Sequence, residues 1–205
     1  MKIVLLNGPP RCGKDTLADM LFAIGGGAHV SFADEVKRAA HRAYGLPVYP
    51  GLYEDRKDDA CPEFDGLTPR RAYQWVSEGA KASHGQDYWG RKLAEKLLAY
   101  ALDGARVAYV TDSGFEPESR VLLDEFGARS LLHVHVVRPS LGLEDWLPGG
   151  PRAGEPFPGD TRSYWTTPGL DPIRVLNDGD LDHLRCRARL LSRVVDRWDR
   201  NGGPG

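Results

Sequence analysis

Short apolar runs alternate along the chain with longer segments in which apolar residues recur at helical spacing. The apolar runs predict strands at residues 2–7, 29–32, 106–111, 131–137 and 173–176. The periodic segments predict helices at residues 16–24, 34–44, 68–83, 87–102, 116–126 and 180–198. Strands that alternate with helices are typical of an α/β fold, so we expect a parallel five-stranded sheet with helices on both faces.

Two segments interrupt this pattern. Residues 46–66 are rich in proline, glycine and aspartate and predict an excursion over the surface, within a helical region at about 46–102. Residues 139–172 carry many prolines and glycines and few apolar runs, so we expect a long mobile lid without a core of its own. Without an internal repeat or a clear linker, the chain is interpreted as a single domain, 1–205.

Composition narrows the function only a little. The 205 residues carry a formal net charge of −2, which provides no global attraction to nucleic acid or to an anionic membrane. Cys12, Cys61 and Cys186 form neither a disulfide framework nor a metal-ligand spacing, which indicates a reducing cytosol. Since no segment is long and apolar enough to span a bilayer, we expect no membrane association.

The strongest chemical motif lies between the first strand and the first helix. Residues 8–16 fit G-x-x-x-x-G-K, with Asp15 where serine or threonine is usual and Thr16 one place later. Such a loop turns successive backbone N–H groups toward phosphates, and the following helix adds its positive N-terminus. The alternative is a glycine turn without function. We expect ATP to contact Gly8, Arg11, Cys12, Gly13, Lys14, Asp15 and Thr16.

Within this loop, Lys14 is expected to bridge the β- and γ-phosphates and to take part in catalysis. Asp15 or Thr16 is expected to reach Mg²⁺, directly or through water. Cys12 is interpreted as a small residue that fills the loop, in preference to a reactive thiol.

The motifs taken together resemble a known family. Gly13-Lys14-Asp15-Thr16 is similar to the P-loop variant of phage deoxynucleoside monophosphate kinases, and further segments match that family in order, at residues 31–37, 68–74 with 88–89, 136–139 and 177–184. The resemblance covers nearly the whole chain. It implies a P-loop kinase with a lid, the substrates ATP and a nucleotide, Mg²⁺ as the metal, and the cytosol of a phage-infected bacterium.

One departure from the family concerns the acceptor. The family has an arginine two places after the aspartate that ends the third strand, whereas here Asp112 is followed by Ser113 and Gly114. This feature, with residues 159–165, resembles a sister group that phosphorylates 5-hydroxymethyluracil in DNA. A neutral hydroxymethyl acceptor needs a base more than it needs arginines, whereas a monophosphate acceptor needs arginines to hold its phosphate.

Several residues have competing roles. Asp112 is interpreted as a magnesium partner or a base, with a cap of the helix at 116–126 as the alternative. Asp34 either caps the second helix or faces the acceptor. Of the lid arginines Arg138, Arg152 and Arg162, we expect Arg162 to contact the transferring phosphoryl group. Arg138 is assigned to the nucleotide.

The remaining candidates concern acceptor binding. Arg38 and Arg70, with Arg71 and Arg91 as alternatives, are expected to hold an acceptor phosphate if there is one. Aromatic stacking on a base is expected from Trp89 and from Tyr164 and Trp165, because the lid provides no core for those two to fill. Trp75, His133 and His135 are interpreted as packing residues.

Three functions therefore follow from the sequence. The favoured one is an ATP-dependent kinase of 5-hydroxymethyluracil in DNA, and the alternative is a kinase of free deoxynucleoside monophosphates. A nucleotide-binding module without catalysis is the third. The expected partners are ATP and DNA with a modified pyrimidine or a free deoxynucleotide; a homodimer is left open.

Overall fold

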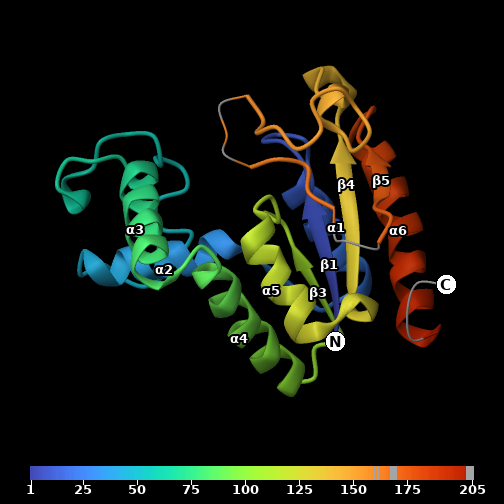
Figure 1. Cartoon of the computed structure of the whole chain (residues 1–205), viewed down its shortest axis with the longest axis horizontal. Helices are drawn as coiled ribbons and strands as arrows, with labels where there is room; N and C mark the ends of the chain where they lie inside the picture. Colours follow the sequence, from blue (N-terminus) through green and yellow to red (C-terminus); the bar gives the residue numbers. More distant parts are fainter. Residues whose placement is uncertain (159, 161, 167–169, 202–205) are drawn as a thin grey trace.

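A sheet of parallel strands forms the centre of the molecule in this computed structural model (Figure 1). The structure describes residues 1–158, 160, 162–166 and 170–201. Within them the sheet has the order β2-β3-β1-β4-β5, and all four pairings are parallel. The strands are β1 (Lys2–Asn7), β2 (Ala28–Val30), β3 (Val107–Val110), β4 (Leu131–Val137) and β5 (Ile173–Leu176). The predicted five-stranded α/β fold is thus confirmed.

The strands are apolar throughout because helices cover both faces of the sheet. In β1, Val4 and Leu6 pack into one core and Ile3 and Leu5 into the other. Successive side chains of a strand point to opposite faces, so a strand buried on both sides must be apolar at every position. β1 lies between β3 and β4, which places its C-terminal end, where the phosphate loop begins, in the middle of the sheet.

Two pairs of helices form the outer layers. α1 (Lys14–Gly25) and α6 (Leu181–Asn201) contact each other and cover one face, where α6 contributes Leu184, Ala188, Leu191 and Val195. α4 (Tyr88–Leu102) and α5 (Glu116–Phe126) cover the other face with Leu93, Leu97 and Leu122. The apolar residues of each helix recur every three or four positions, which gives one buried stripe per helix.

The remaining helices form a lobe at the side of the sheet, which we call the α2–α3 lobe (residues 32–84; Figure 1). It contains α2 (Phe32–Ala43) and α3 (Pro69–His84). Residues 46–66 were predicted as a surface excursion, but Tyr53, Cys61 and Phe64 from this segment are buried against Ala72 of α3. The small core escaped prediction because its aromatic residues are separated by turns and show no regular period.

The lid at 139–172 also has a core, so the expectation that it has none is wrong. It contains two short 3₁₀ turns, η3 (Pro139–Leu141) and η4 (Glu144–Trp146). Trp146, Leu147, Phe157 and Tyr164 are buried together against the end of β4. Widely spaced aromatic side chains thus supply the apolar area that the composition of the segment seemed to lack. Gly159 and Thr161 lie outside the described residues.

The start of α2 and the exposure of one tryptophan differ from what the sequence predicted. α2 begins at Phe32, and Ser31 is its N-cap because the Ser31 hydroxyl accepts a hydrogen bond from the Asp34 N–H at 3.1 Å. Asp34 therefore lies in the first turn and is not the cap. Trp75 on α3 was expected to pack, but its side chain is 70% exposed. None of the described helices combines the length and apolar character that crossing a bilayer requires.

Candidate functional site

The loop between β1 and α1 has the backbone geometry of a phosphate cradle. Gly13 adopts a left-handed conformation with φ of 98°, and Arg11 does so with φ of 64°. A Cβ added at Gly13 would lie 2.6 Å from Nδ2 of Asn177, and one at Gly8 would lie 2.5 Å from the carbonyl oxygen of Val136. Both positions therefore require glycine, because a side chain would strike the neighbouring segments as the loop curls.

Lys14 is folded over this loop. Its ammonium group donates hydrogen bonds to the carbonyl oxygens of Gly8 and Pro9, each at 2.8 Å, and lies 3.7 Å from Sγ of Cys12. The side chain is buried, so its charge is concentrated inside the cradle. Burial raises the pKa of the Cys12 thiol, which agrees with its interpretation as an unreactive loop filler.

Two side chains from later in the chain hold the loop in place. The Asn177 amide, directly after β5, donates to the carbonyl oxygen of Cys12 at 2.9 Å, and Arg138, directly after β4, donates to that of Arg11 at 3.2 Å. Beside them lies a cavity of about 350 Å³. Its lining combines the loop, the start of α6 and both anchors: Gly13, Thr16, Arg138, Asn177, Gly179, Asp180, Leu181 and Leu184.

The first turn of α1 offers oxygen donors at the mouth of the cradle. Asp15 and Thr16 are both exposed there, and a carboxylate and a hydroxyl are ligands suited to Mg²⁺ held partly by phosphate oxygens and water. Within the described part of the chain, no group of three or more histidine, cysteine, aspartate or glutamate residues could hold a metal ion. Asp15 and Thr16 thus fit a metal that is shared with a nucleotide.

Asp112 follows the C-terminal end of β3 and caps a helix, although not the helix at 116–126 that was the alternative to a catalytic or magnesium-binding role. Its two carboxylate oxygens accept hydrogen bonds from the N–H groups of Phe32 and Ala33 at 2.9 Å each, so it caps α2. Burial raises the pKa of Asp112, and the two N–H donors oppose that effect. Each oxygen keeps a second lone pair, so the capped carboxylate can still accept a proton.

Arg162, which lines the same pocket as Asp112, packs against a glycine that leaves it room. A Cβ at Gly114 would lie 2.5 Å from Cβ and 2.7 Å from Cγ of Arg162. The guanidinium is bound by the Asp160 carboxylate, with its shortest contact at 2.6 Å. Burial tends to lower the pKa of Arg162, but Asp160, Asp112 and Asp15 raise it overall, so the guanidinium lies within electrostatic reach of both the phosphate loop and Asp112.

The position of Arg162 bears on the arginine that the sequence lacks two places after Asp112. Gly114 stands where the resembled family has arginine, and the aliphatic part of Arg162 covers that glycine. The lid therefore brings an arginine side chain next to the position of Gly114. Asn7, at the end of β1, ties the same segments together, because its amide donates to the carbonyl oxygens of Ser113 and of Ser163.

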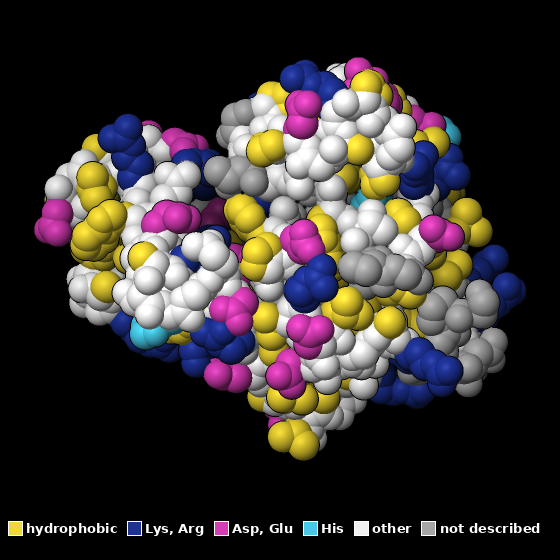
Figure 2. Space-filling view, in the orientation of Figure 1, with side chains coloured by type: hydrophobic (Ala, Val, Ile, Leu, Met, Phe, Trp, Pro, Cys, Tyr) yellow, Lys and Arg dark blue, Asp and Glu magenta, His cyan; other side chains and the backbone are white. Residues whose placement is uncertain are grey.

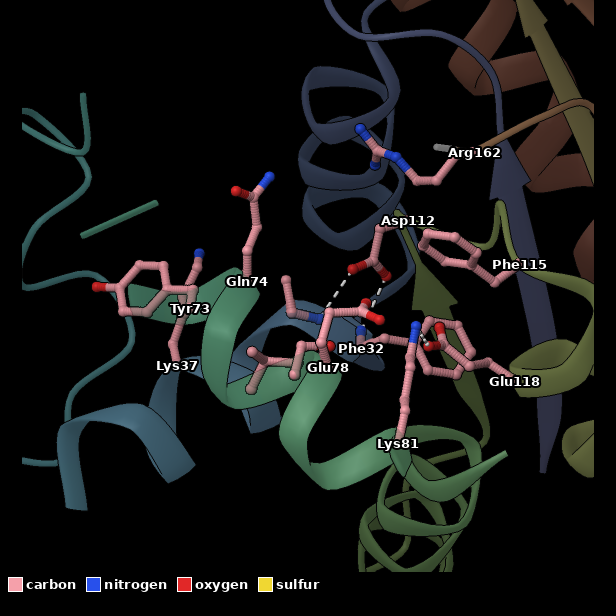
Figure 3. Close-up of a pocket in the computed structure, with 13 residues that line it drawn as sticks. Phe32, Lys37, Tyr73, Gln74, Glu78, Lys81, Asp112, Phe115, Glu118 and Arg162 are labelled. Carbon is pink, nitrogen blue, oxygen red and sulfur yellow. Dashed lines mark hydrogen bonds and ion pairs between the residues drawn. The ribbon is translucent and has the colours of Figure 1, made fainter. Parts of the chain in front are cut away.

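A pocket opens between the α2–α3 lobe and the sheet, where residues of α2 and α3 face Asp112. Its volume is about 280 Å³, and the surface is hollowed between the two parts in Figure 2. We call it the acceptor-side pocket (Figure 3). It is lined by Phe32, Ala33, Val36, Lys37, Tyr73, Gln74, Ser77, Glu78, Lys81, Asp112, Phe115, Glu118 and Arg162.

A buried ion pair closes one end of this pocket. Nζ of Lys81 on α3 lies 3.1 Å from Oε1 of Glu118 on α5, and their side chains are 8% and 5% exposed. The ammonium also lies 4.4 Å from the centre of the Phe115 ring. Burial raises the pKa of Glu118 to about 7, against the opposing effect of Lys81. In Figure 3 this pair and Arg162 lie at opposite ends, with Asp112 and Phe115 between them.

Some predicted acceptor residues do not line this pocket. Asp34 lies 3.9 Å from Lys96 in an ion pair, and Arg38 lies 3.6 Å from the Glu35 carboxylate. Arg70 is bound on the lobe surface by Asp58 at 2.6 Å. Trp89 is 2% exposed, in the core. Helix phase directs these side chains away from the pocket.

The lid aromatics are packing residues in this structure. Tyr164 is 4% exposed, and its hydroxyl donates to the carbonyl oxygen of Val136 at 3.1 Å. The Trp165 ring packs on the core at 5.2 Å from the His133 ring, and its carbonyl oxygen lies 2.9 Å from Nε2 of His135. In this position neither ring can stack on a base as predicted. His133 and His135 of β4 are buried, as expected.

Sequence reasoning missed Lys81 and Glu118. The sequence contains a weak signal for both residues, because each is a charged residue on the side of its helix that faces the protein interior. Lys81 follows Tyr73 and Ser77 at intervals of four, and Glu118 precedes the buried Leu122 by four. A charge on such a face is paired or functional, but the partner sits on another helix and cannot be named from sequence.

The chain was also compared with known proteins. No family model matches it, and no curated protein matches it. Among solved structures, an unliganded sugar kinase from Janibacter sp. HTCC2649 is similar over 97% of this chain and 94% of that chain, at 19% identity and with a TM-score of 0.46. A similarity at this level concerns the fold alone and carries no argument about chemistry.

Proposed function

We propose that this protein is an ATP-dependent phosphotransferase that phosphorylates a nucleoside-type acceptor. The observation that supports this most is the position of Arg162. It lines the acceptor-side pocket together with Asp112, and Asp112 and Asp15 of the phosphate loop both help to raise its pKa. A γ-phosphoryl group above Lys14 would therefore face an acceptor beside Asp112, with a cation at the point where the charge of the transition state develops.

In this proposal ATP lies along the loop, with its base toward the cavity between Arg138 and Leu184. The oxygen of an acceptor hydroxyl forms a bond to the γ-phosphorus, and the bond from that phosphorus to the bridging oxygen of ADP breaks. The hydroxyl proton passes to the Asp112 carboxylate, whose pKa is raised by burial. Mg²⁺ near Asp15 and Thr16 would neutralise charge on the phosphates. Lys14 and Arg162 balance the negative charge that remains.

The favoured acceptor is the hydroxymethyl group of 5-hydroxymethyluracil in DNA. The charges lining the acceptor-side pocket support it, because three cations (Lys37, Lys81, Arg162) are matched by three carboxylates (Glu78, Asp112, Glu118). A pocket without excess positive charge suits a neutral hydroxyl better than a phosphate dianion. A base turned out of the helix would need only this pocket, so the overall charge of −2 is no obstacle.

A kinase of free deoxynucleoside monophosphates is the second candidate. It is favoured by Arg162 over Gly114, which restores a guanidinium close to where the resembled family has one. Lys37 also lines the pocket, and these two side chains would hold an acceptor phosphate. A nucleotide-binding module without catalysis would also use the phosphate loop and the cap that Asp112 provides to α2, but it gives no reason for a pocket beside that carboxylate.

One assay distinguishes these functions. Labelled ATP and Mg²⁺ are offered with each deoxynucleoside monophosphate and with oligonucleotides that contain 5-hydroxymethyluracil or thymine, and the labelled product is identified. Label on the modified oligonucleotide alone supports the favoured acceptor, and label on a free nucleotide supports the second candidate. If ATP binds but no acceptor is labelled and ADP does not form, the protein is not a kinase of these acceptors.

A further inference from the structure

The closed end of the acceptor-side pocket has an unusual composition for a protein interior. Lys81 and Glu118 are almost fully buried and form an ion pair at 3.1 Å, yet both also line the cavity. Removing two charges from water is costly, and the penalty is comparable to the Coulomb energy that the pair regains. A pair of apolar residues would join α3 to α5 at least as well, so stability alone does not explain these charges.

The surroundings of the pair define the shape of a ligand. Phe32 and Phe115 both line the cavity beside it, and the Phe115 ring lies 4.4 Å from the Lys81 ammonium. At this end of the pocket, aromatic side chains beside a charged pair suit a flat ring that is polar along one edge. A sugar, which is polar on all sides, would leave hydroxyl groups against Phe32 and Phe115 without partners.

We propose that Lys81 and Glu118 read the edge of a nucleobase in the acceptor. Glu118 accepts a hydrogen bond from a ring or amino N–H, and Lys81 donates to the adjacent carbonyl oxygen or ring nitrogen. A donor beside an acceptor is the pattern that the edge of a base presents. The inference rests on the proposed function, because it assigns the substrate class of the same site: a nucleoside or nucleotide with an intact base.

This orientation is compatible with either acceptor. With the base edge at Lys81 and Glu118, the rest of the ligand extends toward Asp112 and Arg162 at the other end of the pocket (Figure 3). If the pair binds N3–H and the C2 carbonyl, a 5-hydroxymethyl group on the opposite side of the ring, or a 5′-phosphate beyond the sugar, would then approach the phosphate loop. The pair therefore selects for the base, whereas Asp112 and Arg162 act on the group that is phosphorylated.

Calorimetric binding tests this without relying on turnover. The probes are the four deoxynucleoside monophosphates, 5-hydroxymethyl-2′-deoxyuridine monophosphate, and 2-deoxyribose 5-phosphate, which has no base. We expect at least one nucleotide to bind more than about 10-fold tighter than the probe without a base. Methylation of the edge nitrogen in the tightest binder should weaken it by about 10- to 100-fold, the value of a hydrogen bond to a charged group.

Variants then assign the effect to the pair. Glu118→Gln should remove most of the discrimination against the methylated probe. Glu116→Gln is the matched control, since Glu116 is on the same helix but forms an exposed ion pair with Arg120, and it should change nothing. If Glu118→Gln does not fold, the apolar double variant Lys81→Met/Glu118→Met replaces the buried pair as a whole and should still bind ATP but not select for a base.

Two results would overturn the inference. One is equal affinity of the wild type for probes with and without a base. The other is unchanged discrimination in the folded Glu118 or double variant. Failure of the proposed function looks different, because the wild type would then label no acceptor even if it binds nucleotides selectively. With an active enzyme, the variants should raise KM for the acceptor more than they lower kcat.

Discussion

The contact between Gly114 and Arg162 gives the sharpest test of the site. In Gly114→Ala, the new Cβ would lie 2.5, 2.7 and 2.9 Å from Cβ, Cγ and Cδ of Arg162. Carbon atoms pack at about 3.5–4.0 Å, so the overlap is about 1 Å. Because Cβ of Arg162 is fixed to the backbone, a change of rotamer cannot relieve it, and the lid segment itself must move.

The expected effect is large on the rate and moderate on stability. A displacement of about 1 Å in a positioned group can cost ~10²-fold in rate, so kcat should fall by about that factor while the affinity for ATP is retained. Overpacking should lower the free energy of unfolding by about 1–3 kcal/mol. Both are measured on the same preparation, by steady-state phosphoryl transfer and by urea unfolding.

Gly79→Ala is the matched control. Gly79 is within α3, and a Cβ there would meet nothing within 4 Å, so this change should raise the free energy of unfolding by about 0.5–1 kcal/mol and leave kcat alone. In Gly114→Ala/Arg162→Gly the overlapping side-chain atoms are gone, so stability should recover and kcat should equal that of Arg162→Gly alone. The reasoning is refuted if Gly114→Ala keeps wild-type kcat while Arg162→Gly loses it.

Three further perturbations test other parts of the site. Lys14→Ala should bind ATP more weakly and lower kcat by more than ~10²-fold; a variant with a tenth of wild-type turnover would contradict the role of this lysine. Asp112→Asn should lower kcat by ~10²-fold through loss of basicity. It should also lower the free energy of unfolding by about 1–3 kcal/mol, since an amide NH₂ would face one of the two N–H groups that Asp112 caps; a variant that is impaired only in stability would exclude the base. Burial lowers the pKa of His133 from its ordinary 6.5 to about 3, so its contribution to stability is complete above pH 6.5 and is lost as the pH falls toward 3. Urea unfolding from pH 7 to 4 should therefore be less pH-dependent in His133→Gln, by up to about 1.4 kcal/mol per pH unit; equal slopes would contradict this. Glu118, with a raised pKa of about 7, contributes in the opposite direction, because its effect is lost as the pH rises from about 4.5 to 7.

The predictions that succeeded rest on local patterns. The apolar strands and periodic helices fixed the element order, because burial on one or both faces leaves a period in the sequence. The need for glycine at positions 8 and 13 was also readable, because the backbone path of the loop after β1 leaves no room for a side chain there. That this loop binds phosphate stays a prediction. These features depend on neighbours within a few residues along the chain.

The predictions that failed depend on partners far apart in sequence. Composition suggested a lid without a core, yet Tyr164 is buried with Phe157 and Trp146. Asp112 was interpreted as a magnesium partner or a base, with a cap of the helix that follows it as the alternative. In the structure it caps α2, whose first turn lies 80 residues earlier. Each of these residues could contact many others along the chain. The sequence alone does not show which contact offsets the entropy lost when the intervening chain closes into a loop.

The sequence by itself thus determined a parallel α/β fold with a curled glycine loop at the end of β1, since short-range periodicity and glycine geometry encode both. Tertiary structure alone decided the acceptor side. It brought Arg162 over Gly114 and joined Lys81 to Glu118 across two helices. A charge is buried only where packing places a partner beside it. Which partner that is depends on how the α2–α3 lobe and the lid pack against the sheet.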